Sequence, residues 1–196
     1  MYLFFDTETT GLPRNWHAPV TDLGNWPRMV QLAWLLQNDA GEGFERGSVI
    51  IRPEGFTIPA DAARVHGITT ERALGEGVDL AGALASFAAA MDRATVLVAH
   101  NMSFDEMIAG AEFLRARVPN RLFDMPRFCT MKATTGVCRI PGRYGFKWPT
   151  LTELHQCLFE RPPAAAHDAA ADVEACSACF FELKRRAIIP IPGGPA

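Results

Sequence analysis

The chain has 196 residues, 48% of them hydrophobic, which suits a single compact domain with one sizeable core. Its formal net charge of −3 argues against a protein that coats nucleic acid through its overall field, because such proteins are strongly basic. The sequence contains neither an apolar stretch of membrane length nor a basic-then-apolar leader pattern, so we expect a cytoplasmic protein without a membrane partner.

The first half of the chain is predicted to be rich in strands. Residues 2–5 form an apolar run that stops at Asp6, and the turn-forming sequence Thr-Gly-Leu-Pro comes soon afterwards. Residues 29–36 and 47–52 are rich in β-branched and aromatic side chains, and the sequence Asn-Asp-Ala-Gly between them favours a turn. We therefore expect a strand with an acidic end, followed by a hairpin-like pair of strands.

The second half alternates between strand and helix patterns. Residues 95–99 form another apolar run, and after Asn101 the apolar spacing becomes that of a helix. Further helices are predicted at 80–91, 150–159 and 168–186, a short fifth strand at 121–123, and a flexible tail at 189–196. Together these elements predict one α/β domain over residues 1–188, with a mixed sheet flanked by helices.

Two acids close the first predicted strand. Asp6 and Glu8 are two residues apart, so both side chains project from the same face. Acids at this spacing are common on solvated surfaces, but an ionised acid at the tip of an apolar strand is costly unless a cation or hydrogen bonds compensate. The pair therefore suggests a site for a hard cation.

Three more titratable residues lie near predicted helix starts. Asp105 falls in the first turn after Asn101, where the helix dipole also favours a carboxylate, so helix capping is an alternative role. His167 and Asp172 flank an alanine-rich run that leaves their surroundings uncrowded. Taken alone, His167 would be a polar lead-in residue beside Asp168, a suitable N-terminal helix acid.

The order of these residues resembles the DEDDh 3′-5′ exonucleases, which include polymerase proofreading subunits, ribonuclease T and oligoribonuclease. Asp-Thr-Glu-Thr-Thr-Gly at 6–11 resembles the first motif, and His-Asn-Met-Ser-Phe-Asp at 100–105 the second. His167 followed by Asp172 resembles the third motif, and Val-His-Gly-Ile-Thr at 65–69 resembles a turn between the first two. The resemblance implies a ribonuclease H-like fold with a mixed five-stranded sheet.

The same resemblance implies a two-metal hydrolase that removes nucleoside 5′-monophosphates from the 3′ end of DNA or RNA. Two Mg²⁺ ions, which Mn²⁺ can replace, would be held by Asp6, Glu8, Asp105 and Asp172. His167 would take the proton from the attacking water, because its unperturbed pKa lies near the working pH. These five residues are the predicted catalytic set.

Other residues are placed by the resemblance beside the terminal nucleotide. They are Thr9, Thr10, Gly11, Leu12, His66, Asn101 and Phe104. Several have an equally suitable structural role: Gly11 and Leu12 in an ordinary turn, Asn101 as a helix cap, and His66 in fixing its own turn. The sequence leaves both roles open for each of them.

Two loops add candidate contacts for a nucleic-acid partner. Residues 115–147 carry eight basic residues against one acid, and the 130–149 stretch looks like a substrate-guiding insertion. A second long loop, 15–28, holds Trp16 and Trp26, which either stack on bases or cover the sheet. The expected partner is a single-stranded 3′ end, with a polymerase, a repair protein or a second copy of the chain as further candidates.

Two alternatives to a general exonuclease stay open at this point. One is a non-catalytic nucleic-acid-binding module of the same fold, although all four acids and the histidine are present. The other is an oligoribonuclease-like enzyme for short oligonucleotides, which would use the same metal chemistry. No motif reports on the sugar 2′ position, so the sequence does not separate DNA from RNA or proofreading from repair.

Overall fold

The computed structural model describes residues 1–163 and 168–188, so both His167 and the predicted tail at 189–196 lie outside the described residues. The strands are β1 (Tyr2–Thr9), β2 (Met29–Gln37), β3 (Gly43–Ile50), β4 (Val96–Ala99), β5 (Arg127–Cys129), β6 (Pro141–Gly142) and β7 (Gly145–Phe146). The helices are α1 (Ala60–His66), α2 (Thr70–Glu76), α3 (Leu80–Arg93), α4 (Met102–Ala116), the 3₁₀ helix η1 (Leu122–Asp124), α5 (Thr130–Ala133), α6 (Thr135–Cys138), α7 (Leu151–Phe159) and α8 (Ala169–Arg185). No helix among the described residues has the length and apolarity needed to cross a membrane.

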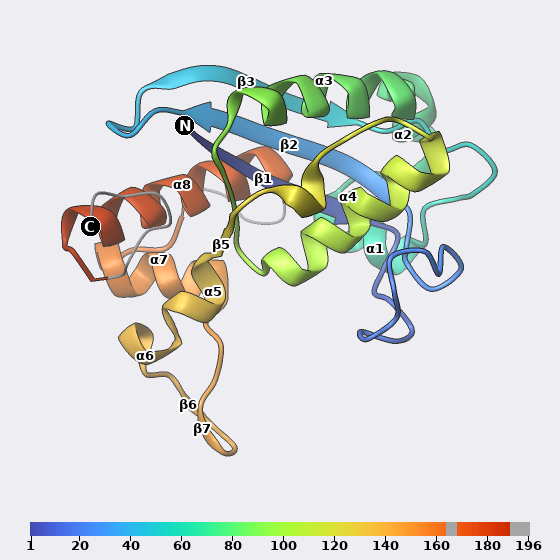
Figure 1. Cartoon of the computed structure of the whole chain (residues 1–196). Coiled ribbons are helices and arrows are strands. Elements are labelled where there is room, and N and C mark those ends of the chain that lie inside the picture. The colour runs from blue at the N-terminus through green and yellow to red at the C-terminus, as the bar shows by residue number, and fades with distance from the viewer. Residues whose placement is uncertain (164–167, 189–196) are drawn as a thin grey trace.

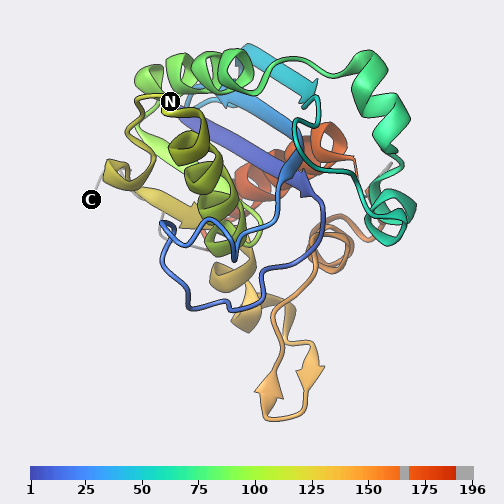
Figure 2. The same ribbon diagram turned by 90° about the vertical axis from the view of Figure 1, so that its right-hand side faces the viewer.

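The predicted mixed sheet is confirmed. Its five strands are ordered β3-β2-β1-β4-β5, with β1 antiparallel to β2 and parallel to β4. The predicted hairpin is present as β2 and β3, which pair in antiparallel fashion. Both faces of the sheet carry helices, α3 and α4 on one side and α8 on the other (Figures 1 and 2).

The continuous apolar run of β1 follows from this double cover. Leu3 and Phe5 point to the α3–α4 side, where the Phe5 and Phe87 rings lie 5.3 Å apart between centroids. Phe4 points to the other side, where its ring centroid lies 5.3 Å from that of Phe180 in α8. A strand with both faces buried has no need of polar alternation, which explains why this segment reads as uniformly apolar.

The predicted acidic end of the first strand is present. β1 extends beyond the apolar run to Thr9, because its pairing with β2 continues through Asp6 opposite Ala33 and Glu8 opposite Gln31. On its other side, β1 pairs with β4 only as far as Phe4. The acids therefore lie within the strand, beside an edge that the shorter parallel neighbour leaves open.

The predicted fifth strand at 121–123 is wrong. The segment forms η1, because the Asn120 side chain accepts the Leu122 N–H at 3.1 Å and the Arg121 carbonyl accepts the Asp124 N–H at 3.0 Å. These local bonds use backbone groups that a strand would offer to a neighbour. The fifth strand is instead β5, which pairs in parallel with β4.

Residues 130–149, predicted as a loop, fold into two short helices and the β6–β7 hairpin. We call this segment the arm; its hairpin projects from the body of the molecule (Figures 1 and 2).

Both ends of the arm are held by the imidazole of His100. His100 Nε2 donates to the Pro149 carbonyl at 3.0 Å, and its Nδ1 lies 2.9 Å from the Thr130 hydroxyl. Burial lowers the pKa of His100 to about 4, so the ring is neutral and Nδ1 accepts from Thr130.

The loop between β1 and β2 is anchored to α4 by a buried carboxylate. Glu112 is fully buried and accepts from Arg28 Nε at 2.8 Å and from the Met29 N–H at 2.9 Å. Arg115 forms a second ion pair with it at 3.0 Å and donates to the Trp26 carbonyl at 2.7 Å. The network fixes the path of the loop against the helix that follows β4.

Candidate active site

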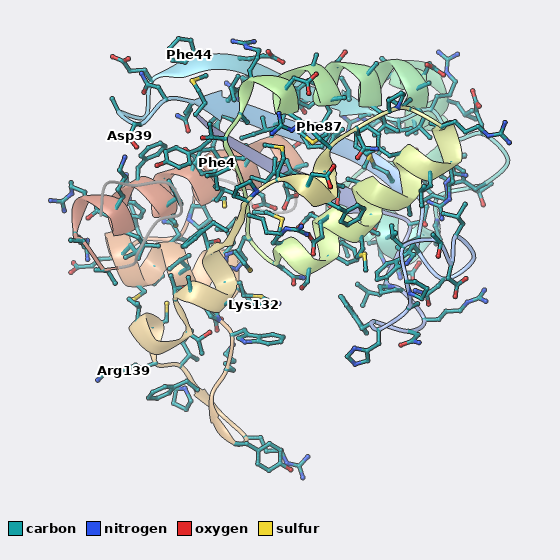
Figure 3. The ribbon with its side chains drawn as sticks, viewed as in Figure 1. Phe4, Asp39, Phe44, Phe87, Lys132 and Arg139 are labelled. Carbon is teal, nitrogen blue, oxygen red and sulfur yellow. The ribbon has the colours of Figure 1, made fainter. Side chains whose placement is uncertain are left out.

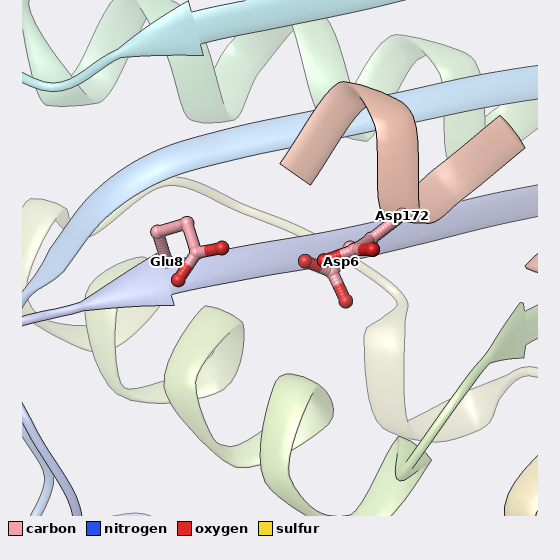
Figure 4. Close-up of side chains that lie close together, drawn as sticks. All are labelled: Asp6, Glu8 and Asp172. Atoms are coloured by element: carbon pink, nitrogen blue, oxygen red, sulfur yellow. The ribbon is translucent and has the colours of Figure 1, made fainter. Parts of the chain in front are cut away.

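Three carboxylates meet on the α8 side of the sheet. Asp6, Glu8 and Asp172 each offer an oxygen, and these atoms all lie within 4.8 Å of one another (Figure 4). Asp6 and Glu8 share a face because alternate residues of β1 point the same way, and the first turn of α8 adds Asp172. The set contains only oxygen donors, which suit hard cations such as Mg²⁺ and Mn²⁺.

The start of α8 is fixed by side-chain hydrogen bonds. The Asp168 carboxylate caps the helix by accepting the N–H groups of Ala170 at 2.9 Å and Ala171 at 3.2 Å, as the sequence predicted for this acid. Gln31 of β2 accepts the N–H of Ala169 at 3.3 Å and ties the same turn to the sheet. These bonds determine where Asp172 stands relative to β1.

Asp105 approaches the cluster from the opposite face of the sheet. It is 2% exposed, and its Oδ1 accepts from the Thr7 N–H at 3.1 Å and from the Thr7 hydroxyl at 2.8 Å. Thr7 has its N–H free for this bond because β4 does not pair with β1 beyond Phe4. Asp105 is not part of the close trio, but it lines the same cavity.

The carboxylates of the site repel one another and are poorly solvated. Burial raises the pKa of Glu8 to about 7, and the charge of Asp172 adds to the effect. Burial raises the pKa of Asp105 to about 8, against the opposing effect of the Thr7 hydrogen bonds. Burial and the nearby Asp105 raise the pKa of Asp6 well above its ordinary range. Positive charge placed here would relieve both the burial cost and the repulsion.

A cavity of about 720 Å³ opens over these acids. Its lining includes all four acids together with three of the predicted substrate contacts, Leu12, Asn101 and Phe104. The other predicted contacts, Thr9, Thr10, Gly11 and His66, are not among its lining residues. The structure therefore brings together the predicted metal ligands and a part of the predicted nucleotide contacts.

The residues after Glu8 make structural bonds of their own. The Thr9 hydroxyl donates to the Gly11 carbonyl at 2.7 Å, and the Thr10 hydroxyl accepts the Arg28 N–H at 3.0 Å. Both hydroxyls are thus used in shaping the loop, as expected for a turn. Leu12 lies two residues after Thr10 and lines the cavity, and it is 72% exposed.

The sequence left Asn101 and His66 each with a structural role or a role in binding the nucleotide, and the structure places them differently. Asn101 does not cap α4 through its side chain; it lines the cavity with φ at 74°, and its Oδ1 accepts the Ser103 hydroxyl at 3.2 Å. His66 does fix its turn, because Nδ1 accepts the Ile68 N–H at 3.2 Å. Burial lowers the pKa of His66, against the opposing effect of the Thr9 backbone.

Two residues of the site, Thr7 and His100, were not identified from the sequence as functional residues. Thr7 holds Asp105, and its position between two acids already places it on the opposite face of the strand. His100 opens the second motif and ties the arm to the end of β4. Trp148, one of the aromatic residues interleaved with the predicted basic stretch, lines the cavity from the arm.

Comparison with solved structures shows the fold of this chain. E. coli exonuclease I in complex with a dT13 oligonucleotide is 21% identical, with a TM-score of 0.75 over 95% of this chain and 41% of that chain. A product-bound exonuclease I is 19% identical, with a TM-score of 0.71 over 95% of this chain and 44% of that one. The ExoI/SSB-Ct complex is 18% identical, with a TM-score of 0.72 over 94% of this chain and 41% of that chain. The chain thus spans less than half the length of these proteins, and it has their ribonuclease H-like fold.

A protein-family model gives the assignment. No curated protein sequence matches the chain. The model described as Exonuclease, of the RNase T type, matches residues 3–180, a range that contains the four acids lining the cavity. The match therefore covers both the sheet and the first turns of α4 and α8 that build the site. The chain belongs to the RNase T exonuclease family, of the DEDDh type.

Proposed function

We propose that this protein is a 3′-5′ exonuclease that hydrolyses the terminal phosphodiester bond of DNA or RNA and releases nucleoside 5′-monophosphates. The observation that carries the proposal is the meeting of Asp6, Glu8 and Asp172 within 4.8 Å, with Asp105 in the same cavity. Four carboxylates from two helices and one strand repel one another in this cavity, and their repulsion opposes folding unless positive charge compensates it. They fit a site that receives positive charge.

Divalent cations fit this donor set. Asp6, Glu8 and Asp172 would hold one ion, and Asp6 with Asp105 a second, with Mg²⁺ or Mn²⁺ favoured by the oxygen ligands. When bound, two such ions neutralise the phosphate and promote attack by water. The chain itself contributes orientation: Thr7 fixes Asp105, and the capped first turn of α8 fixes Asp172.

His167 is proposed to take the proton from the attacking water. It lies outside the described residues, directly before Asp168, whose carboxylate caps the helix that carries Asp172. A neutral imidazole near its ordinary pKa suits proton transfer close to neutral pH. His167→Ala should cut turnover at least a hundredfold while leaving the affinity for single-stranded DNA unchanged in the presence of metal. Near-normal turnover would remove this histidine from the mechanism.

The terminal nucleotide is proposed to lie against Leu12 and Phe104. Both side chains line the cavity above the acids, and Asn101 offers an amide at the same wall. Thr9, Thr10 and Gly11 would support this site by holding Leu12 in place, and His66 by holding the turn next to Thr9. The E. coli enzyme of the same fold was solved with a dT13 oligonucleotide, which supports an unpaired end as the substrate.

The proposal is tested with 5′-labelled oligonucleotides. Wild type and Asp6→Ala are incubated with single- and double-stranded DNA and RNA, in Mg²⁺, Mn²⁺ or chelator. We expect a ladder that shortens from the 3′ end, requires metal, and is absent for Asp6→Ala. Asp92→Ala, which removes an exposed aspartate of α3, is the matched control and should behave as wild type.

Three results would contradict the proposal. Immediate release of the label as a mononucleotide would show the opposite polarity, and cleavage in chelator would exclude the metal site. Binding without any cleavage would favour the non-catalytic module. A ladder restricted to the shortest oligonucleotides would instead identify an oligoribonuclease-like enzyme.

A further inference from the structure

A second cavity continues from the one above the acids. It has a volume of about 630 Å³ and lies beside α5 and the start of α4. Four residues line both cavities: Trp16, Asn101, Met131 and Trp148. A chain that entered the first cavity with its end would therefore have its next units in the second.

The two cavities differ in charge. The first is lined by four carboxylates, whereas the second has none among its lining residues and includes Lys132. Lys132 lies in α5, where the arm begins (Figure 3). The lysine can attract an anion to this cavity without a bound metal ion. Most of the other lining residues are apolar or aromatic. Phosphate and flat bases together match both properties.

The aromatic surface of the second cavity comes from two tryptophans on different segments. Trp16 belongs to the loop after β1 and is 49% exposed, and Trp148 belongs to the arm and is 60% exposed. The other two tryptophans, Trp26 and Trp34, are 3% and 5% exposed. The exposure is therefore confined to the two indoles that line the cavities.

Both exposed indoles stand next to anchored backbone. Before Trp16, the main chain of Asn15 and the side chain of Asn25 exchange two hydrogen bonds, at 2.7 and 2.9 Å, and the Trp16 ring lies 5.7 Å from that of Phe104. After Trp148, the Pro149 carbonyl accepts from His100. Surfaces held in place in this way lose little conformational entropy when a ligand stacks on them.

We propose that the second cavity is a stacking subsite for the unpaired bases that adjoin the terminal nucleotide, with Trp16 and Trp148 as its stacking surfaces and Lys132 beside a phosphate. The inference rests on the proposed exonuclease function, which fixes the end of the strand at the acids. A base inside a duplex is already paired and stacked on both sides, so it has no face to offer the indoles. The subsite therefore selects single strands over duplex ends.

Binding of a fluorescein-labelled single-stranded oligothymidylate tests the subsite, in chelator so that the probe is not cut. Trp16→Leu and Trp148→Leu should each weaken binding about tenfold to a hundredfold, the range measured for loss of one stacked base. The matched control is Phe44→Leu, which removes an aromatic ring of similar exposure, 55%, from β3 at a distant edge of the molecule (Figure 3). Its affinity should equal that of wild type.

An abasic probe separates stacking from a merely structural role. We expect wild type to bind the oligothymidylate less tightly when the second or third nucleotide from the 3′ end lacks its base, and both leucine variants to be insensitive to that change. Because the abasic change is made in the probe, this comparison tests the subsite in the wild-type protein and does not depend on the folding of a variant. Equal affinity of wild type for intact and abasic probes would overturn the proposal, as would leucine variants that bind like wild type.

Failure of the subsite is distinguishable from failure of the proposed function. If wild type cleaves DNA with Mg²⁺ but neither substitution nor abasic site changes binding, the exonuclease stands and the stacking subsite is wrong. In that case the two tryptophans would belong to a surface for another protein. If wild type neither binds nor cleaves, the proposed function itself fails.

Discussion

Replacing Glu8 by glutamine is expected to stabilise the metal-free protein at alkaline pH while weakening the proposed metal site. Burial and the charge of Asp172 raise the pKa of Glu8 from 4.5 to about 7. In the unfolded chain the carboxyl keeps its ordinary pKa, so the folded state binds the proton more tightly. The folding cost of this group is therefore absent below pH 4.5, grows as the pH rises, and is complete above about 7.

The size of the effect follows from the same two pKa values. A tenfold change in proton affinity corresponds to about 1.4 kcal/mol, so a rise from 4.5 to about 7 amounts to about 3 kcal/mol in the fully ionised state. Because the side chain is partly exposed, we expect about 2 kcal/mol of added stability for Glu8→Gln at pH about 8. Near pH 4.5 the difference should be close to zero.

Guanidinium denaturation in chelator at both pH values measures this difference. Glu54→Gln, which changes an exposed glutamate, is the control and should leave the free energy of unfolding unaltered at both. Added Mg²⁺ at the higher pH should stabilise wild type more than Glu8→Gln, because only wild type keeps the full set of ligands. A stability difference that is the same at both pH values would refute the electrostatic reasoning.

Three further predictions concern the frame around the site. Glu112→Gln should lower the free energy of unfolding by about 3 kcal/mol in denaturant titrations, because two arginines lose their buried partner; a loss below about 1 kcal/mol would contradict this. Gly47→Ala should lower it by about 1 to 3 kcal/mol in thermal melts, because the new Cβ would overlap the Trp34 ring, and an unchanged melting temperature would refute the packing argument. His100→Gln should make the arm more sensitive to limited proteolysis, since the hydrogen bond to Pro149 is weakened; equal cleavage rates would exclude that role.

The elements predicted well from the sequence are those whose signal is local. Residues 29–36 carry β-branched and aromatic side chains before a turn, and β2 forms there. The helix after Asn101 repeats its apolar residues at helical spacing, and α4 follows. In contrast, β5 is a strand of three residues that exists through pairing with β4, and no periodicity is visible over that length.

The same distinction separates the parts of the site. The spacing of Asp6 and Glu8 was enough to place both on one face, because strands alternate with period two. Their meeting with Asp172 depends on how α8 crosses the sheet, so only the resemblance of ordered motifs indicated it. The bond between Thr7 and Asp105 depends on where β4 stops, which is a property of the assembled sheet and of no single segment.

One imidazole fixes the points at which the arm leaves and rejoins the body, through the Thr130 hydroxyl and the Pro149 carbonyl. Within the arm, Met131 and Thr134 are buried against the body, whereas the β6–β7 hairpin is exposed, so the hairpin could change in length or sequence without moving the carboxylates on the sheet. If the arm contacts nucleic acid as proposed, its contacts could therefore vary in evolution while the acidic cluster stays the same. Exchanging the β6–β7 hairpin for one of different length and sequence would test whether the two parts are independent.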